Sequence, residues 1–450
     1  MQASRSLPII FLALAGCATL PPETPSQAAG AVTWRRDATA DAAAQRQSDE
    51  WLAKPLDADR AAQIALLANP DVQGQFERLG VARGAYLAAA AAPNPVIDWQ
   101  RRALKDGGGA RVEWGLTQNI LGLLTLPARR SSATAELEGA RLDAAREVEH
   151  LALEARAAFW TSQAAERVVE LRKQHADLGR LAFEVAGRYR DAGNIKALEF
   201  EEERTRHLEA RKAFDEATLA ALDARLNLAR VLGVLGRDLP LRVSGRLPVL
   251  PSSDPTVPDL EKVALDRRLD LRAQRRRAES ALERLGIARG TRLVPALEVG
   301  VAREREPGGE RLSGPSAALE LPLFEARTAE IVAGDAEARL ALRELESRML
   351  DVRREVRLGQ ATLAHARRQV EVWQGEVVPA RQKIVDGNAR EFFYMLRGPF
   401  DPMHARQAEL EAEIEAVNAL RDYWLARVQL ARASGELALV KADEPKEAAK

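Results

Sequence analysis

Residues 328–385 read TAEIVAGDAEARLALRELESRMLDVRREVRLGQATLAHARRQVEVWQGEVVPARQKIV, and apolar or small side chains recur along this stretch at alternating intervals of three and four residues. The helix breakers in it are three glycines and Pro379. Unbroken spacing of this kind over five heptads predicts a coiled-coil seam on a very long helix. The seam consists of Leu342, Leu345, Met349, Val352, Val356, Gly359, Leu363, Ala366, Val370, Trp373 and Val377.

A weaker seam with the same spacing runs through the first half of the chain. A helix from Ala128 to Tyr189 would be about 90 Å long at 1.5 Å per residue. Such a rod cannot bury its apolar side within a globular domain, so it must lie against other long helices. Small residues in both seams permit close approach and favour a wall of many helices. The weaker seam consists of Val148, Leu151, Ala155, Ala158, Ser162, Ala165 and Val169.

Four motifs recur in the second half in the same order and at nearly constant separation. A single match carries little weight in a sequence rich in Ala and Arg, but four matches in order predict an internal duplication. The pairs are NPDV at 69–72 with RLDL at 268–271, LGVARG at 79–84 with LGIARG at 285–290, DAGN at 191–194 with DGN at 386–388, and LARVLG at 228–233 with LARASG at 430–435.

Each half is expected to contain a short helix, a β-hairpin, a very long helix, a sharp turn and a second long helix. A proline-rich linker joins the halves. The predicted boundaries are a signal peptide at 1–16, a lipidated N-terminal linker at 17–56, a first repeat at 57–236 with a hairpin at 95–120, a linker at 237–258, a second repeat at 259–440 with a hairpin at 295–322, and a disordered tail at 441–450.

The predicted hairpins follow the period of a strand rather than that of a helix. Residues 112–117 alternate strictly, with a partner strand around 96–102, and the second hairpin is expected to have a loop at 304–314. One apolar face opposite a face of Glu, Gly, Thr and Ala is typical of a membrane barrel strand, although a half-buried soluble sheet alternates in the same way. The side chains expected to face lipid are Val112, Trp114, Leu116, Leu297, Val299, Val301, Leu319 and Leu321.

An export signal and helices too long to cover a soluble sheet favour the membrane interpretation. Four strands cannot close a barrel, and open strand edges are not tolerated in lipid. Several copies must therefore pool their strands, and three copies would supply a closed barrel of 12 strands. The expected fold class is mainly α, with long coiled-coil helices and a membrane β-barrel portion.

The N-terminus predicts export. Arg5 precedes a short apolar run that ends in small residues directly before Cys17, which is the pattern of a secretory signal peptide. Cys17 is the only cysteine, and its position resembles a bacterial lipobox, in which the thiol is acylated; an ordinary signal peptide that contains a Cys is the alternative. Ala18 follows in place of Asp, and this resemblance to lipoprotein sorting favours the outer membrane.

Composition and motif content argue against several classes of function. The chain has 66 basic and 66 acidic residues, so it lacks the basic excess of a nucleic-acid-binding protein. It contains no glycine-rich phosphate loop, Ser/His/Asp arrangement or Cys/His cluster, so no catalytic residue, metal site or cofactor is expected. Met403-His404 is more typical of a helix start than of a metal ligand. The five histidines stand far apart at His150, His175, His207, His365 and His404.

Over residues 56–439 the chain resembles the TolC family of outer-membrane efflux proteins. The residues that carry the resemblance are NPDV at 69–72, Pro295, LPLF at 321–324, and YRDAGN at 189–194 followed by ALE at 197–199. The resemblance implies a homotrimer with a 12-stranded barrel in outer-membrane lipid above a periplasmic α-barrel. It also implies docking on a periplasmic adaptor protein and an inner-membrane pump. The lipobox is most similar to the lipoprotein branch, which serves multidrug or metal-ion efflux.

The two helix turns are the candidate functional site. In many members of the family the second turn leads into a helix whose acidic residues narrow the pore, but here Phe393 and Leu396 stand at those positions. Turns with Gly beside Asp or Asn are adaptable tips, so they are expected to form a closed periplasmic mouth; ordinary helix caps without a gating role are the alternative. The residues are Asp191, Gly193, Asn194, Glu199, Asp386, Gly387, Asn388 and Arg390.

The function expected from the sequence is a passive export duct for small molecules or metal ions, without enzymatic activity. Type I protein secretion through the same kind of channel is one alternative. A periplasmic coiled-coil adaptor or scaffold lipoprotein without a pore is the other.

Overall fold

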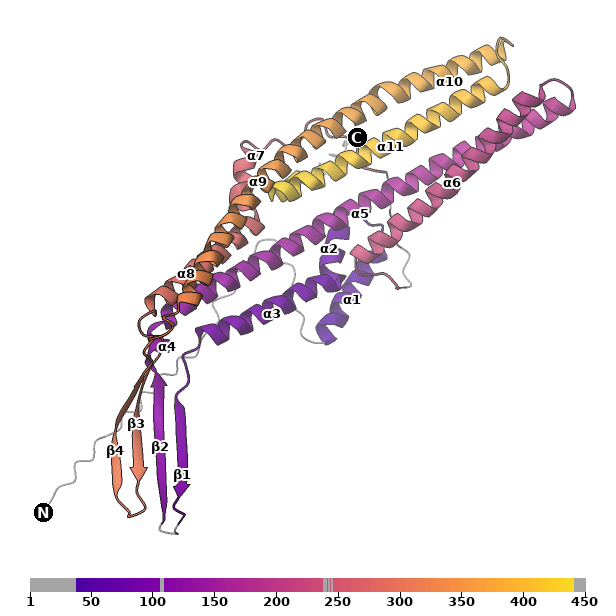
Figure 1. Ribbon diagram of the computed structural model, residues 1–450. Helices are drawn as coiled ribbons and strands as arrows, with labels where there is room; N and C mark the ends of the chain where they lie inside the picture. The colour runs from indigo at the N-terminus through magenta and orange to yellow at the C-terminus, as the bar shows by residue number, and fades with distance from the viewer. Residues whose placement is uncertain (1–37, 106–108, 238–240, 242, 244–245, 441–450) are drawn as a thin grey trace, which may run out of the picture. The chain divides into compact units, whose positions relative to one another are not determined.

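The computed structural model describes residues 38–105, 109–237, 241, 243 and 246–440 (Figure 1). The expected signal peptide, Cys17 and the C-terminal tail lie outside these residues. The described chain is mainly helical with one four-stranded sheet, so the expected class is confirmed. It forms two compact units, and each combines segments of both repeats. One unit consists of residues 77–142 and 272–346, and the other of residues 38–76, 143–271 and 347–440.

Both halves show the same order of elements. The first contains α2 (Ala58–Ala68), α3 (Pro70–Ala90), β1 (Val96–Ala103), β2 (Ala110–Asn119), α4 (Ile120–Leu124), α5 (Leu126–Asp191) and α6 (Ala197–Val231). The second contains α7 (Leu260–Arg267), α8 (Leu269–Gly290), β3 (Leu297–Arg305), β4 (Arg311–Leu319), α9 (Thr328–Val372), the π-helical turn η1 (Trp373–Val377), α10 (Val378–Phe393), α11 (Phe400–Ser434) and the 3-10 turn η2 (Leu437–Val440).

The second part of the expected N-terminal linker at 17–56 contains a helix that the sequence analysis did not predict. Helix α1 (Ala38–Leu52) begins where the description starts. Its residues Ala44, Ser48 and Leu52 are buried at intervals of four, so one side of the helix is covered. Two of these side chains are small or polar and carry little hydrophobic signal, which is why the periodicity of the sequence did not reveal the helix.

The long helix of the second repeat contains Pro379 without ending there. The backbone N–H of Val378 donates to the carbonyl oxygen of Trp373, five residues earlier, in the wider turn η1. Proline has no N–H and its ring clashes with the carbonyl of the preceding helical turn. A π-helical turn relieves that clash locally. The buried part of the predicted seam runs from Val352 to Val370 on α9.

The four strands form one antiparallel sheet in the order β1-β2-β3-β4. The second loop is shorter than the expected 304–314, because β3 ends at Arg305 and β4 begins at Arg311. Gly314 was expected to end the loop, but it lies within β4, opposite Ala302, and Pro315 lies opposite Val301 in the ladder. β4 is an edge strand, where a residue without an N–H can be accommodated.

Aromatic side chains and the inter-repeat linker form the core of the second unit. Trp160 of α5 and Trp424 of α11 are fully buried, with ring centroids 5.0 Å apart. The indole N–H of Trp424 donates to the carbonyl oxygen of Pro248 over 3.0 Å, and the Tyr423 hydroxyl donates to the Asp254 carboxylate over 2.5 Å. Burial raises the pKa of Tyr423. The proline-rich linker is therefore fixed to α11 by specific hydrogen bonds.

The same closing contact occurs in each repeat. In the first, the side-chain amide of Asn69 donates to the carbonyl oxygen of Val231 over 2.8 Å, beside Gly233. In the second, Arg268 Nη1 donates to the carbonyl oxygen of Ala433 over 3.1 Å, beside Gly435. These partners belong to the NPDV/RLDL and LARVLG/LARASG matches, so those two matches are structural equivalents.

The LGVARG/LGIARG match is not a structural equivalence. Helix α3 begins at Pro70 and α8 begins at Leu269, so aligning the two starts places Leu79 opposite Ala278 rather than opposite Leu285. The two hexapeptides therefore lie about two helical turns out of step along equivalent helices. Composition explains the coincidence, because Leu, Ala, Gly and Arg are frequent in both helices.

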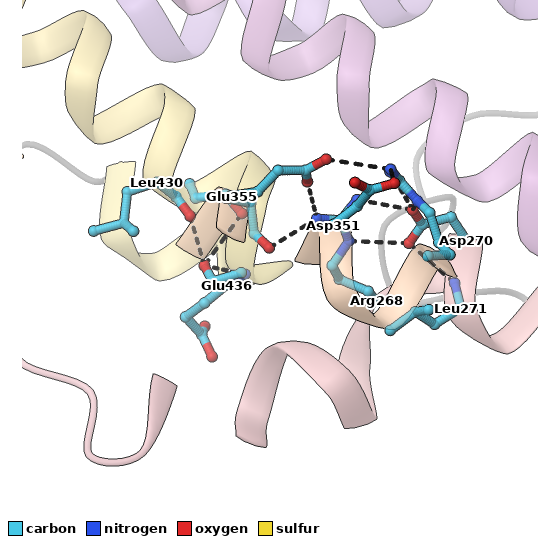
Figure 2. Close-up of polar contacts among 11 residues, drawn as sticks. Arg268, Asp270, Leu271, Asp351, Glu355, Leu430 and Glu436 are labelled. Atoms are coloured by element: carbon cyan, nitrogen blue, oxygen red, sulfur yellow. Dashed lines mark hydrogen bonds and ion pairs between the residues drawn. The ribbon is translucent and has the colours of Figure 1, made fainter. Parts of the chain in front are cut away.

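Arg268 also belongs to a network of charged side chains at the start of α8 (Figure 2). Arg268 donates to both carboxylate oxygens of Asp270, over 3.0 and 2.8 Å, and Arg348 of α9 donates to the same carboxylate over 2.7 Å. Glu355 accepts from both arginines. Burial alone would raise the pKa of Asp270, but the hydrogen bonds and charges of the arginines outweigh it and lower the pKa to about 2.

The two closing glycines differ in the space around them, which gives a matched test. Both have positive φ, but an added Cβ at Gly233 would lie 2.5 Å from Asn69 Cα, whereas at Gly435 the nearest atom would be 3.6 Å away. We expect Gly435→Ala to cost about 1–2 kcal/mol of unfolding free energy from backbone strain, and Gly233→Ala about 1–3 kcal/mol more from overpacking. Thermal unfolding followed by circular dichroism measures both. Equal midpoints for the two variants would contradict this account.

The Asp270 network predicts a pH dependence of stability. Because the pKa of Asp270 falls from 3.8 to about 2 on folding, its contribution is complete above about pH 4 and is lost as pH falls toward 2. We expect the wild type to lose on the order of 1–2 kcal/mol across this window through this group, after allowance for solvent screening. Asp270→Asn should be less stable at neutral pH and should lack this part of the dependence. Asp215→Asn, an exposed change on α6, is the control.

Candidate functional site

The first helix turn lies where the sequence predicts it. α5 ends at Asp191, and Gly193 has a φ of +74°. The Asn194 N–H donates to the carbonyl oxygen of Tyr189 over 2.8 Å and the Gly193 N–H to that of Arg190 over 2.9 Å, a Schellman arrangement that ends the helix. Glu199 accepts from the Lys196 N–H over 3.4 Å at the start of α6. Four of the candidate residues are therefore together in one turn: Asp191, Gly193, Asn194 and Glu199.

The second turn does not lie at 386–388, and that expectation was wrong. Asp386, Gly387, Asn388 and Arg390 all belong to α10, which continues to Phe393. The Asn388 side-chain amide donates to the carbonyl oxygen of Ile384 over 3.0 Å, and Arg390 Nε donates to that of Asp386 over 3.3 Å. Both are bonds back to the preceding helical turn. The similarity of DGN to DAGN misled the sequence interpretation, because the first turn uses its glycine to end the helix and the second does not.

The actual second turn repeats the hydrogen bonds of the first without a glycine. The Leu396 N–H donates to the carbonyl oxygen of Glu391 and the Met395 N–H to that of Phe392, each over 2.9 Å. Met395 takes the left-handed conformation, with a φ of +61°. It is the structural equivalent of Gly193, because each is the left-handed residue just beyond the long helix of its repeat. Because methionine does not signal such a conformation, the sequence could not place this turn.

This turn exposes a continuous run of large apolar side chains. Phe393 is 79% exposed and Met395 92% exposed in the described chain. The rings of Phe393 and Tyr394 lie edge to face, with centroids 5.6 Å apart. Isolated exposed apolar residues are ordinary, but a contiguous group of them is typical of a surface that interacts with another protein, a ligand or a membrane. The run consists of Phe392, Phe393, Tyr394, Met395 and Leu396.

A polar contact joins the helices that return from the two turns. His404 Nε2 of α11 lies 2.9 Å from Glu203 Oε1 of α6, and Arg206 binds the same carboxylate oxygen. The Glu203 side chain is buried. Among the residues that the structure describes, no three His, Cys, Asp or Glu side chains are grouped so that they could hold a metal ion.

The sheet register places the predicted lipid-facing residues on a common face. Trp114 lies between Trp99 and Arg303, and Leu116 lies between Ile97 and Val301. Leu321 lies two residues beyond the end of β4 and is not part of the ladder. Ile97 and Trp99 of β1 also belong to this face, and both are strongly exposed. In the described residues, no helix is long and apolar enough to cross a membrane.

Comparison with known proteins agrees with this architecture. Residues 260–436 match the family model described as "Outer membrane efflux protein". The outer-membrane channel OprN superposes with a TM-score of 0.71 at 18% identity, covering 93% of this chain and 99% of that chain. The CmeC outer membrane channel of Campylobacter jejuni gives a TM-score of 0.70 at 14% identity, covering 93% of each chain. The chain has the fold of outer-membrane efflux channels.

A third channel of this fold, the open state of MtrE from Neisseria gonorrhoeae, has a TM-score of 0.66 at 18% identity and covers 84% of this chain and 88% of that chain. No curated protein sequence matches the chain. The expected resemblance to the TolC family of outer-membrane efflux proteins is confirmed by the family match in the second repeat and by the efflux-channel fold of nearly the whole chain. The matched family is one of efflux proteins and not of enzymes.

Proposed function

We propose that this protein is the outer-membrane channel of a tripartite efflux system. Three copies form a passive duct for small molecules or metal ions across the outer membrane and the periplasm. The observation that carries the proposal is a sheet with two open edges in a chain whose fold is that of efflux channels. The chain performs no chemical step in this role and needs no cofactor.

The sheet edges support a closed barrel of several copies. Within the described residues, β1 pairs only with β2, and β4 only with β3, along 8 and 9 residue pairs. In hydrocarbon the unpaired backbone groups on the outer sides of β1 and β4 would each cost several kcal/mol. Pairing β4 of one copy with β1 of the next removes every edge, and three copies close the barrel.

The helical part would carry the surface at which the partner proteins of the proposed system dock. Helices α5 and α6, and α10 and α11, form two hairpins that end in the turns described above. These turns would lie at the periplasmic end, where a periplasmic adaptor protein and an inner-membrane pump dock. Acylation of Cys17 would add an anchor in outer-membrane lipid. The alternative function is that of the outer-membrane channel in type I protein secretion, since the fold fits both uses.

Closure of the periplasmic end is proposed for both turns. Asp191, Gly193, Asn194 and Glu199 belong to the first turn. Asp386, Gly387, Asn388 and Arg390 would contribute from α10 rather than from the second turn itself, beside the exposed run at 392–396. An adaptor that binds the open arrangement more tightly would shift such a bistable element.

The pore and the trimer can be tested together. In a Cys17→Ala background, we expect Asp98→Cys of β1, combined in turn with Leu312→Cys, Gly314→Cys or Ser316→Cys of β4, to give a covalent three-chain product in at least one combination. The purified protein should require detergent and should form pores in planar bilayers. The measurements are denaturing gel electrophoresis and conductance.

The control pair is Gly115→Cys with Ser316→Cys. Gly115 lies in β2, which already has partners on both sides, so this pair should give no link between copies. A wild type that stays monomeric in water and forms no pore would refute the channel and favour the scaffold alternative.

Closure is tested by reversing charge at the tips. If the tip residues hold the mouth closed, we expect Asp191→Lys with Asp386→Lys to raise single-channel conductance, because repulsion or lost pairing destabilises the closed arrangement. Asp215→Lys, which changes an exposed Asp of α6 away from the turn, should leave conductance unchanged. Unaltered conductance in this variant would leave Asp191 as part of an ordinary helix cap and Asp386 as an ordinary residue of α10.

A further inference from the structure

The register of the sheet sorts its charged side chains onto two faces with different chemistry. We call the face with the tryptophans the apolar face and the opposite one the polar face. From the helices toward the hairpin loops, the rows of the apolar face are Leu297 and Leu319; Gln118, Val299 and Ala317; Ile97, Leu116, Val301 and Pro315; Trp99, Trp114, Arg303 and Ser313; Arg101, Val112, Arg305 and Arg311; and the small pair Ala103 and Ala110.

On the polar face, arginines and glutamates neutralise one another. Arg111 lies 3.1 Å from the carboxylate of Glu113 and 3.2 Å from that of Glu306, and it also binds Glu304. Arg102 lies 4.0 Å from Glu113. Apart from Arg111–Glu113, which lies within β2, these contacts join β2 to β1, to β3 or to the residue after β3. Both arginines on this face therefore have partners within one chain.

On the apolar face, four arginines have no such partners. Arg101, Arg303, Arg305 and Arg311, which we call the distal arginines, are all exposed. They form no ion pair within the part of the chain that the structure describes, and no Asp or Glu of the four strands lies on their face. Arg305 and Arg311 are directly opposite each other in the ladder, an arrangement of like charges that is unfavourable without a counterion.

The position of these arginines along the strands indicates what the counterion is. Trp99 and Trp114 share a row with Arg303, and the other three arginines stand one row further toward the hairpin loops. Tryptophan is enriched at the boundary between membrane and water. Arginine on the lipid face of a barrel is costly at the midplane but not near the interface. The apolar rows therefore end where headgroups would begin.

We propose that the distal arginines bind the phosphate groups of phosphorylated glycolipids in the outer leaflet. This inference rests on the proposed function, because it requires the apolar face to lie in lipid with the hairpin loops outward. Arginine presents a fork of donors that matches phosphate oxygens, often in bidentate fashion. A lipid layer alone offers an apolar zone and an anionic zone in the order that the rows of this face require.

Neighbouring copies cannot provide these counterions from their strands. In a barrel built from identical chains, each copy contributes the same apolar face, which again lacks carboxylates. Closure would in addition bring Arg311 on one edge strand near Arg101 on the edge strand of the next copy. The assembly thus concentrates positive charge in a ring and increases the need for external anions.

The test is binding of diphosphoryl lipid A to the detergent-solubilised, lipid-stripped full-length assembly, measured by native mass spectrometry with dephosphorylated lipid A as the reference probe. We expect the wild type to bind the phosphorylated form at least about tenfold more tightly, since each arginine near an anionic lipid surface contributes about fivefold. Arg101→Gln/Arg303→Gln/Arg305→Gln/Arg311→Gln should lose most of this preference. Added salt should weaken the wild-type preference.

Adjacent residues of one strand provide the control. Arg101 and Arg102 face opposite sides of β1, so Arg101→Gln should lower the preference for the phosphorylated probe and Arg102→Gln should not. This pair also decides the question if the fourfold variant fails to assemble. An equal preference in Arg101→Gln and Arg102→Gln, or none in the wild type, would overturn the proposal. Conductance in bilayers of neutral phosphatidylcholine reports the pore separately, so loss of the pore there would count against the proposed function instead.

Discussion

The backbone hydrogen bonds missing along the outer sides of β1 and β4 are the constraint on which the rest of the molecule depends. In the part of the chain that the structure describes, each of these strands runs for its whole length without a bulge and pairs on one side only. Soluble proteins protect such edges with short strands, bulges or inward charges, and membrane proteins remove them by closing a barrel. In the proposed channel, few strands per chain, several copies and a lipid environment are three aspects of one requirement. The long helices of neighbouring copies would then form a wall of their own, because many of their apolar side chains stay exposed within one chain.

The two repeats agree most closely in the length of their long helices and in the spacing of the residues that end them. The helix formed by α9, η1 and α10, from Thr328 to Phe393, is as long as α5. In each repeat the left-handed residue, Gly193 or Met395, follows the end of this helix at the same position, and the closing glycine follows at the same distance again. The chemistry at equivalent points nevertheless differs. Asn69 closes one repeat with an amide, and Arg268 closes the other from within an ion-pair network.

Periodicity was sufficient to predict the long helices, both hairpins and the class of fold, because each of these carries a repeated physical signal. The first turn was predicted from its glycine beside Asp and Asn. What could not be predicted depends on single residues in unusual roles. Met395 adopts a left-handed conformation without being glycine, and Pro315 lies within a strand. Helix α1 buries Ala44 and Ser48, which look like linker residues. The distal arginines require the strand register, since alternation along one strand cannot show which charges of other strands share its face.

The π-helical turn at Trp373–Val377 divides the longest helical run of the second repeat into two parts. The two parts differ in how well their side chains are shielded from solvent. α9 contributes fully buried valines on its inner side, whereas no residue of α10 is buried in the described chain. Local opening follows the number of buried contacts and intact backbone bonds. The segment beyond Pro379 can therefore unwind and exchange its amide protons without disturbing α9. The π-helical turn thus confines fraying of the helix end to α10, about the last four helical turns.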